Sequence, residues 1–239
     1  MKPDLLRFND IKSNTPFWDY HIHTDITDGT STIKEYIETA IELKLHAIAF
    51  TEHVRKNSEW YSSFVEYINT LRESYKNKIR IFHGIETKVL SMWGDLDATQ
   101  EMLDTAELIL GSVHRFPPSC VVNPEWKTNQ KEENFAEIEF QLSKAIIKNP
   151  SVDVLAHPGG MFMRKFNKQF PKRYLEDLLD LANKTNTAVE INSSYLKDHY
   201  LDMDLFSRKN PYVSLGSDAH SKEELGTNIR FMKNLHQKV

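Results

Sequence analysis

The stretch DYHIHTDITDG, residues 19–29, places two histidines one residue apart at the end of an apolar segment. Side chains alternate between the two faces of a β-strand, so His21 and His23 point to the same side while Ile22 points to the other. Asp28 follows in the next loop, directly before a glycine. Imidazoles on one face with a carboxylate just beyond them are typical ligands of a metal ion. We therefore expect this strand to begin a metal site.

Six further segments are also short, apolar and rich in β-branched residues, and helical patterns separate them. The expected strands are residues 16–23, 46–53, 79–86, 107–114, 152–158, 187–194 and 212–220. The expected helices are residues 31–45, 62–76, 97–107, 133–148, 173–185, 202–209 and 222–237. This alternation implies parallel strands joined by right-handed crossovers. It predicts an α/β fold, either a closed or nearly closed barrel or an open doubly wound sheet.

The first expected helix carries its own start signal. Ser31 or Thr32 takes the N-cap position with Glu35 nearby, and apolar residues such as Ile33 and Ile37 recur along one face. A capping residue followed by this periodicity is typical of an amphipathic helix.

Two connections are longer than the others, residues 115–134 and residues 158–172. Long connections in compact domains are often functional. The second is expected to be a loop, and it is rich in cations: Arg164, Lys165, Lys168 and Lys172.

Composition limits the classes of protein to consider. The 239 residues, 40% of them hydrophobic, suffice for one large domain, so residues 1–239 are expected to form a single unit. A net charge of -4 and a pI near 6.2 provide no general basic field for nucleic acid, which makes such a partner a poor expectation. The sequence carries no signal for oligomeric state.

A single cysteine, Cys120, excludes an intrachain disulfide and a cysteine-rich zinc site. Any metal must then be held by nitrogen and oxygen, and a reducing, cytoplasmic setting is expected. The N-terminus has no apolar signal region, and no run of about 18 apolar residues could span a bilayer. We therefore expect no membrane association.

The last few residues of every expected strand include a histidine or a carboxylate. These residues are His21, His23, Glu52, His53, Glu86, His114, His157, Glu190, Asp218 and His220. A parallel α/β barrel brings all its strand ends to one rim, so side chains far apart in sequence would converge there. One such histidine alone is more often structural, and Asp28 and Asp218 could instead form turns or helix caps. The whole set favours a site, whereas the role of His83 is ambiguous.

Histidine and carboxylate without cysteine favour a hydrolytic metal cluster over a structural zinc site. Zinc, iron and manganese all accept these ligands, and carboxylates can bridge two ions. We expect two or three divalent or transition metal ions.

Six motifs occur in a fixed order: HIHTDITDG, AFTEH, GIE, GSVH, AHP and GSDAH. In this order they resemble the polymerase and histidinol phosphatase (PHP) family, from about Trp18 to His220. The resemblance implies a distorted (β/α)7, TIM-like barrel with a metal site at the C-terminal ends of its strands. Asp28 stands where some members have histidine, and its oxygen is an acceptable ligand.

The resemblance also implies three metal positions. His21, His23, Glu86 and Asp218 would hold the first, Asp28, His53 and His220 the second, and Glu86, His114 and His157 the third.

These observations lead to a metal-dependent phosphomonoesterase that hydrolyses a small phosphorylated metabolite, resembling histidinol phosphatases, with a hydroxide bound to the ions as nucleophile. A phosphodiesterase or exonuclease is the first alternative, and it requires a cationic groove for a strand. A non-catalytic metal-binding module is the second, and it predicts lost ligands.

The substrate phosphate needs positive donors, and arginine matches its geometry. Arg115 and Arg164 are the expected phosphate ligands, with Arg55 as a third, although a loop arginine is often merely solvated. Together with Asp218 and His220, the first two are the expected catalytic residues. Glu52 or Glu190 could protonate the leaving group or orient a histidine. Aromatic residues near strand ends could shape the pocket: Trp93, Phe116, Trp126 and Tyr195.

Overall fold

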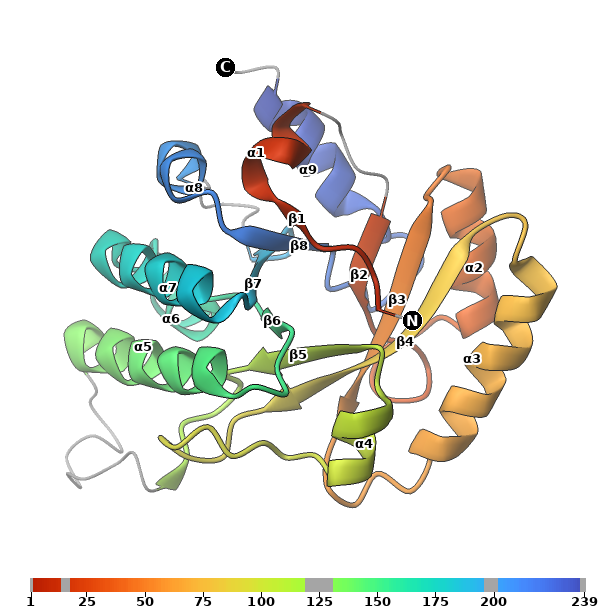
Figure 1. The fold of residues 1–239 in the computed structure, drawn as a ribbon, viewed down its shortest axis with the longest axis horizontal. Coiled ribbons are helices and arrows are strands. Elements are labelled where there is room, and N and C mark those ends of the chain that lie inside the picture. The colour runs from red at the N-terminus through yellow and green to blue at the C-terminus, as the bar shows by residue number, and fades with distance from the viewer. Residues whose placement is uncertain (1, 14–17, 119–130, 196–201, 237–239) are drawn as a thin grey trace.

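The computed structural model describes residues 2–13, 18–118, 131–195 and 202–236. Its centre is one sheet of eight strands in the order β1-β8-β7-β6-β5-β4-β3-β2 (Figure 1). The strands are β1 (Leu6–Arg7), β2 (Trp18–Ile22), β3 (Ala47–Val54), β4 (Arg80–Lys88), β5 (Leu108–Ser112), β6 (Val154–Leu155), β7 (Ala188–Asn192) and β8 (Tyr212–Gly216). Neighbours from β2 to β8 pair in parallel, which confirms the seven predicted strands, and β1 pairs antiparallel with β8.

The first and last parallel strands come together and bend the sheet into a distorted (β/α)7 barrel. An isolated bridge joins Ile22 to Ala219, and the N–H of His23 donates to the carbonyl of Ala219 at 2.9 Å. The buried carboxylate of Asp19 on β2 accepts the N–H of Ser217, just after β8, at 2.9 Å. Because the contacts of Ile22 and His23 with Ala219 are made at the C-terminal end of β2 and just after β8, they hold together the rim where a barrel builds its active site.

Helices cover the outside of the barrel. In Figure 1, α2 and α3 flank the β2–β4 part of the sheet, while α5 and α7 lie along the β5–β7 part. The described helices are α1 (Phe8–Ser13), α2 (Ile33–Glu42), α3 (Tyr61–Tyr75), α4 (Gln100–Thr105), α5 (Glu132–Lys148), α6 (Gly160–Phe166), α7 (Lys172–Thr185), α8 (Met203–Lys209) and α9 (Thr227–His236).

Helix α2 begins as the sequence predicts, with Thr32 as its N-cap. The Thr32 hydroxyl accepts the N–H of Glu35 at 3.3 Å, and the Glu35 carboxylate accepts the N–H of Thr32 at 2.9 Å. Such a reciprocal capping box satisfies two backbone donors that the helix leaves free. Ser31, the alternative cap, instead accepts the N–H of Lys222 at 3.0 Å.

Residues 158–172 are only partly a loop, so that prediction is wrong for Gly160–Phe166, which form α6. The carboxylate of Glu139 on α5 accepts the N–H groups of Met161 and Phe162 at 3.0 and 2.8 Å. A buried acid from another element therefore satisfies the first donors of this short helix, and no local sequence signal reports it.

The other predicted loop, residues 115–134, lies largely outside the described residues, as do Cys120 and Trp126, and its last three residues belong to α5. The short elements β1 and α1 were not predicted. Leu6 and Arg7 pair with Val213 and Tyr212 of β8, a contact between distant parts of the chain.

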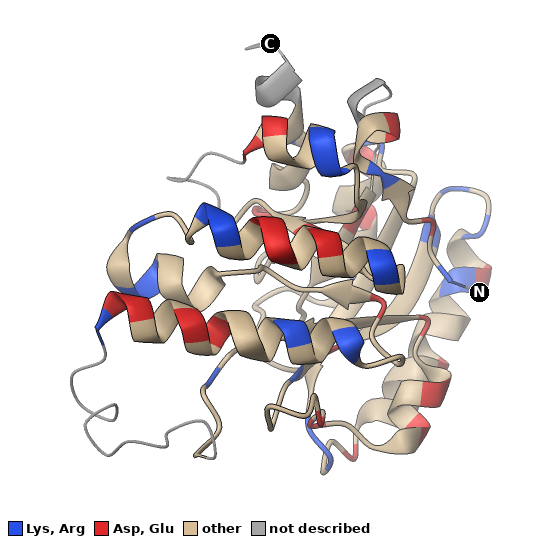
Figure 2. Ribbon diagram, turned by 60° about the vertical axis from the view of Figure 1, so that its left-hand side comes forward, with Lys and Arg blue, Asp and Glu red and all other residues tan. Residues whose placement is uncertain are grey.

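Both signs of charge are spread over the helices, with lysine and arginine interspersed among aspartate and glutamate (Figure 2). Among the described helices, none combines the length and the apolar character needed to cross a membrane.

Candidate metal centre

The strand ends bring the predicted ligand-type side chains to one edge of the sheet. β2 carries His21, with His23 directly after its last residue, β3 carries His53, and β4 carries Glu86. The remaining positions lie just after strands or in the loop that follows β2: Asp28, His114, His157, Asp218 and His220. Parallel pairing places the carboxyl ends of neighbouring strands side by side, so these residues meet.

Glu86 lies at the centre of this cluster. Its Oε1 is 2.9 Å from Nε2 of His114 and 2.9 Å from Nε2 of His157. Its Oε2 lies 2.9 Å from Nδ1 of His53 and 3.4 Å from Nε2 of His21. This second oxygen is buried and has no partner in hydrogen-bond geometry among the described residues. A buried carboxylate oxygen surrounded by imidazole nitrogens fits a cation better than a network of hydrogen bonds.

The histidine pairs support the same conclusion. The Nε2 atoms of His21 and His23 are 3.0 Å apart, and those of His114 and His157 are 3.3 Å apart. The first pair also lies 3.6 and 3.4 Å from Oδ1 of Asp218. Nitrogen and carboxylate lone pairs that point at one spot form the ligand arrangement expected around a metal ion.

Three groups of residues have ligand atoms within 4.8 Å of one another and could each hold an ion. They are His21, His23 and Glu86; His23, Asp28, His53 and His220; and His53, Glu86 and His114. In the second group, Oδ2 of Asp28 lies 3.3 Å from Nε2 of His53 and 3.6 Å from Nε2 of His220. Compared with the sets that the family resemblance implies, His23 also belongs with the second group and His53 with the third. Asp218 and His157, which the resemblance places in the first and third sets, belong to none of these groups.

Burial and charge set the protonation of the cluster. Burial lowers the pKa of His23 to about 4, so its ring is neutral at pH 7 and has a lone pair for a metal. Burial alone would lower the pKa of His21 too, but Glu190, Asp218 and Glu86 hold it well above its usual value. Burial would raise the pKa of Asp218, yet the neighbouring histidines keep it below its ordinary range. Because imidazole and carboxylate stabilise each other's charge here, a bound cation would compete with protons for the same atoms.

A second row of buried acids lies behind the ligands. Oε1 of Glu190 is 2.7 Å from Nδ1 of His21, and Oε2 accepts the N–H of His157 at 2.7 Å. A Cβ on Gly216 would lie 2.1 Å from Oε1 of Glu190, so glycine is needed for this close approach. Glu52 accepts the N–H of Thr24 at 2.9 Å. Neither acid lines the cavity above the cluster, so neither is placed to protonate a leaving group.

Two residues of the cluster adopt left-handed backbone, His157 with φ 28° and Asp218 with φ 56°. Such conformations cost a non-glycine residue roughly 1–3 kcal/mol and gather at functional sites. The strain is therefore consistent with side chains aimed for chemistry rather than for packing.

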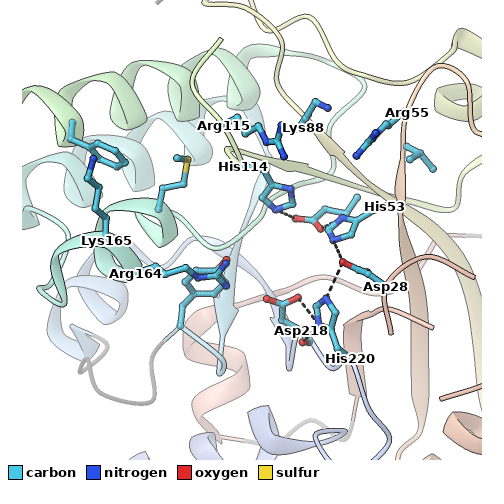
Figure 3. Close-up of a pocket in the computed structure, with 15 residues that line it drawn as sticks. Asp28, His53, Arg55, Lys88, His114, Arg115, Arg164, Lys165, Asp218 and His220 are labelled. Atoms are coloured by element: carbon cyan, nitrogen blue, oxygen red, sulfur yellow. Dashed lines mark hydrogen bonds and ion pairs between the residues drawn. The ribbon is translucent and has the colours of Figure 1, made fainter. Parts of the chain in front are cut away.

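A cavity of about 750 Å³ opens above the cluster, and cations lie around it (Figure 3). The three predicted arginines, Arg55, Arg115 and Arg164, all line it, and sequence reasoning missed Lys88 and Lys165 as lining residues. Lys88 lies two residues beyond Glu86 on one strand face, and Lys165 directly follows Arg164, which are signals that the sequence offered.

Of the described aromatic residues predicted to shape the pocket, one lines the cavity and two do not. Tyr195 lines the cavity, with the Arg164 guanidinium 4.9 Å from its ring centre. Phe116 packs on Phe135 at 4.4 Å, and Trp93 is 91% exposed and does not line the cavity. His83 faces Glu107 at 3.6 Å and belongs to none of the three groups.

Comparison with known proteins places this geometry in a family. The sequence matches the PHP domain over residues 19–194. It is 25% identical over 232 residues to "DNA polymerase/3'-5' exonuclease PolX" of Bacillus subtilis (strain 168), which covers 93% of this chain and 36% of that protein. It is 27% identical over 216 residues to a "Probable phosphatase" of Clostridium novyi (strain NT), covering 84% of this chain and 78% of that one.

Among solved structures, the fold is similar to histidinol phosphate phosphatase from Lactococcus lactis subsp. lactis Il1403, complexed with zinc, L-histidinol and phosphate. The TM-score is 0.72 at 21% identity, and the match covers 92% of each chain.

Proposed function

The chain belongs to the PHP domain family, and from this premise we propose that residues 1–239 form a single metal-dependent phosphomonoesterase domain acting on a small phosphorylated metabolite. The observation that carries the proposal is the position of Glu86, which belongs to two of the three groups of metal-type ligands and lies beneath a cavity rimmed by cations. A floor that can bind several cations and a rim that can bind an anion are together suited to a phosphate ester.

The residues fit two or three ions of zinc, iron or manganese. His21, His23, Glu86 and Asp218 would hold the first, Asp28, His53 and His220 the second, and Glu86, His114 and His157 the third. Such ions lower the pKa of water and offset the charge that builds on a phosphoryl group. A water molecule would then serve as the nucleophile that attacks phosphorus, so the protein need not supply one.

Side chains of the rim would orient the phosphate. Arg115 and Arg164 line the cavity beside the cluster and offer paired N–H donors to phosphoryl oxygens. The Arg164 guanidinium lies over the ring of Tyr195, which limits its motion. Arg55 lines the same cavity, on the edge that also carries Arg115 (Figure 3). Asp218 and His220 complete the expected catalytic set from the floor.

The ligands of the Lactococcus structure support the substrate class. That protein holds zinc, L-histidinol and phosphate, the parts of a small phosphorylated metabolite after hydrolysis. The 750 Å³ cavity here is of the size that binds such molecules.

A phosphodiesterase or exonuclease is the second candidate, because one relative carries that activity in its name. The chain spans only 36% of that relative's length. A strand-binding protein needs a continuous cationic groove, and the mixed charges of Figure 2 do not favour one.

The test is phosphate release by metal-supplemented protein from p-nitrophenyl phosphate, bis(p-nitrophenyl) phosphate and a short oligonucleotide. We expect the monoester to be hydrolysed fastest. Asp218→Ala should abolish the reaction, and Asp104→Ala, which removes an exposed carboxylate of α4, serves as its matched control. Faster cleavage of the diester or the oligonucleotide would favour the second candidate, and no metal-stimulated cleavage of any of them would refute both.

A further inference from the structure

Once the proposed metal ligands are set aside, the described side chains that line the cavity include cations but no carboxylates. The carboxylates among the described lining residues are Asp28, Glu86 and Asp218, all three of them in the proposed metal-binding set. The cations are Arg55, Lys88, Arg115, Arg164 and Lys165. A leaving group with an ammonium would therefore meet cations and no uncommitted acid among these residues, whereas a leaving group with a negative charge would be attracted.

The cations lie on two sides of the cluster. Figure 3 shows Arg55, Lys88 and Arg115 along one edge, and Arg164 and Lys165 on the side of α6. One phosphoryl group bound at the cluster needs only the nearest of them. The cations farther from the cluster are available to another part of the substrate.

Lys165 lies among the cations that line the cavity, and its ammonium rests on two aromatic rings. Its ammonium lies 4.5 Å from the ring centre of Phe135 and 5.5 Å from that of Phe166. Within the described residues it has no carboxylate partner, whereas the ammonium of Lys88 lies 2.8 Å from Oδ2 of Asp97. An exposed, unneutralised ammonium on an aromatic platform can bind an anion without first breaking an ion pair.

The platform is fixed by the buried acid Glu139. This residue of α5 accepts the N–H groups of Met161 and Phe162 in the first turn of α6. Phe135 lies one turn before Glu139 on α5, and Lys165 lies one turn after Met161 on α6. The two sides of the platform are thus tied together, and Lys165 keeps its position relative to the cavity.

We propose that Lys165, on the Phe135 and Phe166 rings, forms an anion subsite that binds a second negatively charged group on the leaving group of the substrate. The inference rests on the proposed phosphomonoesterase function and narrows its substrate class. The second group is a carboxylate or a second phosphate, since both present oxygens that accept N–H donors from an ammonium. The substrate is then a metabolite with an anionic group in addition to the phosphate ester, rather than a phosphorylated amino alcohol.

Matched pairs of esters test the subsite. Glucose 6-phosphate is compared with 6-phosphogluconate, which adds a carboxylate, and fructose 6-phosphate with fructose 1,6-bisphosphate, which adds a phosphate. Histidinol phosphate supplies the ammonium. We expect kcat/KM to be about tenfold or more higher for the anionic member of at least one pair, the range of a charge-assisted hydrogen bond, and higher than for histidinol phosphate. Whichever pair responds identifies carboxylate or phosphate as the second group.

Lys165→Gln should reduce that preference. We expect it to lower kcat/KM about tenfold more for the ester with the added carboxylate or phosphate than for the ester without it. The matched control is Lys168→Gln. Lys168 lies three residues farther on, pairs with Glu132 at 2.7 Å and does not line the cavity, so its substitution should leave the preference intact.

Hydrolysis of the esters with no preference for the anionic members, or with histidinol phosphate preferred over them all, would overturn the subsite and leave the phosphomonoesterase proposal standing. An equal loss for both members in Lys165→Gln would also overturn it. If no ester in the panel is hydrolysed with any metal, the proposed function itself fails.

Discussion

The floor and the rim of the cavity are built in different ways. The floor is formed by histidines and acids at strand ends, and His21 and His23 are completely buried. Apart from Lys88 at the end of β4, the rim is formed by exposed cations from strand-end loops and α6, such as Arg115 and Lys165. Groups on a rigid sheet keep one geometry, whereas loops and short helices tolerate change. From this difference we infer that the floor carries the metal chemistry and that the rim determines which substrate is bound.

The largest expected effect comes from breaking the floor at its centre. Glu86→Gln removes the charge that two of the three metal groups share, and we expect hydrolysis to fall by more than about 100-fold, beyond the ~10–100-fold typical of residues that only orient ligands. Elemental analysis should show fewer bound ions, and circular dichroism should show an unchanged fold. Glu38→Gln on the exposed face of α2 is the control. Full activity in Glu86→Gln would show that the residues of the floor are not required for hydrolysis.

The next effect concerns the acid behind the floor. Glu190→Gln weakens the contacts to Nδ1 of His21 and to the N–H of His157, so we expect a loss of about 10–100-fold in metal affinity and activity together. Competition with a chelator measures the affinity. A loss of activity at unchanged metal affinity would contradict an orienting role.

Changes at the rim should be smaller and should depend on the substrate. Arg164→Ala removes a charged donor to phosphate, and we expect kcat/KM for a phosphate ester to fall about tenfold or more while bound metal stays constant. If Arg164→Ala instead releases metal, the separation of rim from floor is wrong.

The smallest expected effect on hydrolysis is at Glu139, whose main signature is the pH dependence of stability. Burial raises the pKa of Glu139 to about 7 in the folded protein, against 4.5 for an ordinary glutamate. Between these values the unfolded chain binds fewer protons, so the free energy of unfolding falls as the pH rises from about 4.5 to about 7. Glu139→Gln cannot ionise and should lack this part of the fall. Urea unfolding at pH 5 and pH 8 measures it, and identical pH dependence in both proteins would contradict the assignment.

Most of the floor could be predicted from sequence, because its signal is local. A histidine or acid at the end of each apolar segment is visible in the chain, and the barrel needs only parallel order to bring such ends together. The seven strands and the N-cap Thr32 were predicted for the same reason. The roles of the individual ligands remain a prediction that metal binding has to test.

The rest depended on contacts between distant residues. Helix α6 follows Pro158 and Gly159, which read locally as a loop, and its first turn is capped by Glu139 from α5. The two residues of β1 form a strand only because β8 lies beside them. Lys165 looked like one of several loop cations, and only the packing of α6 on α5 places it on the Phe135 ring.

The central claim is that the strand-end cluster binds the ions on which hydrolysis depends. Chelator-treated protein titrated with zinc, manganese or ferrous iron tests it, with bound metal counted by elemental analysis while phosphate release from p-nitrophenyl phosphate is followed. We predict that activity appears only as ions bind and reaches its maximum with no more than three ions per chain, one for each group of ligands. Undiminished hydrolysis by the metal-free protein, or bound metal without any hydrolysis, would contradict the account.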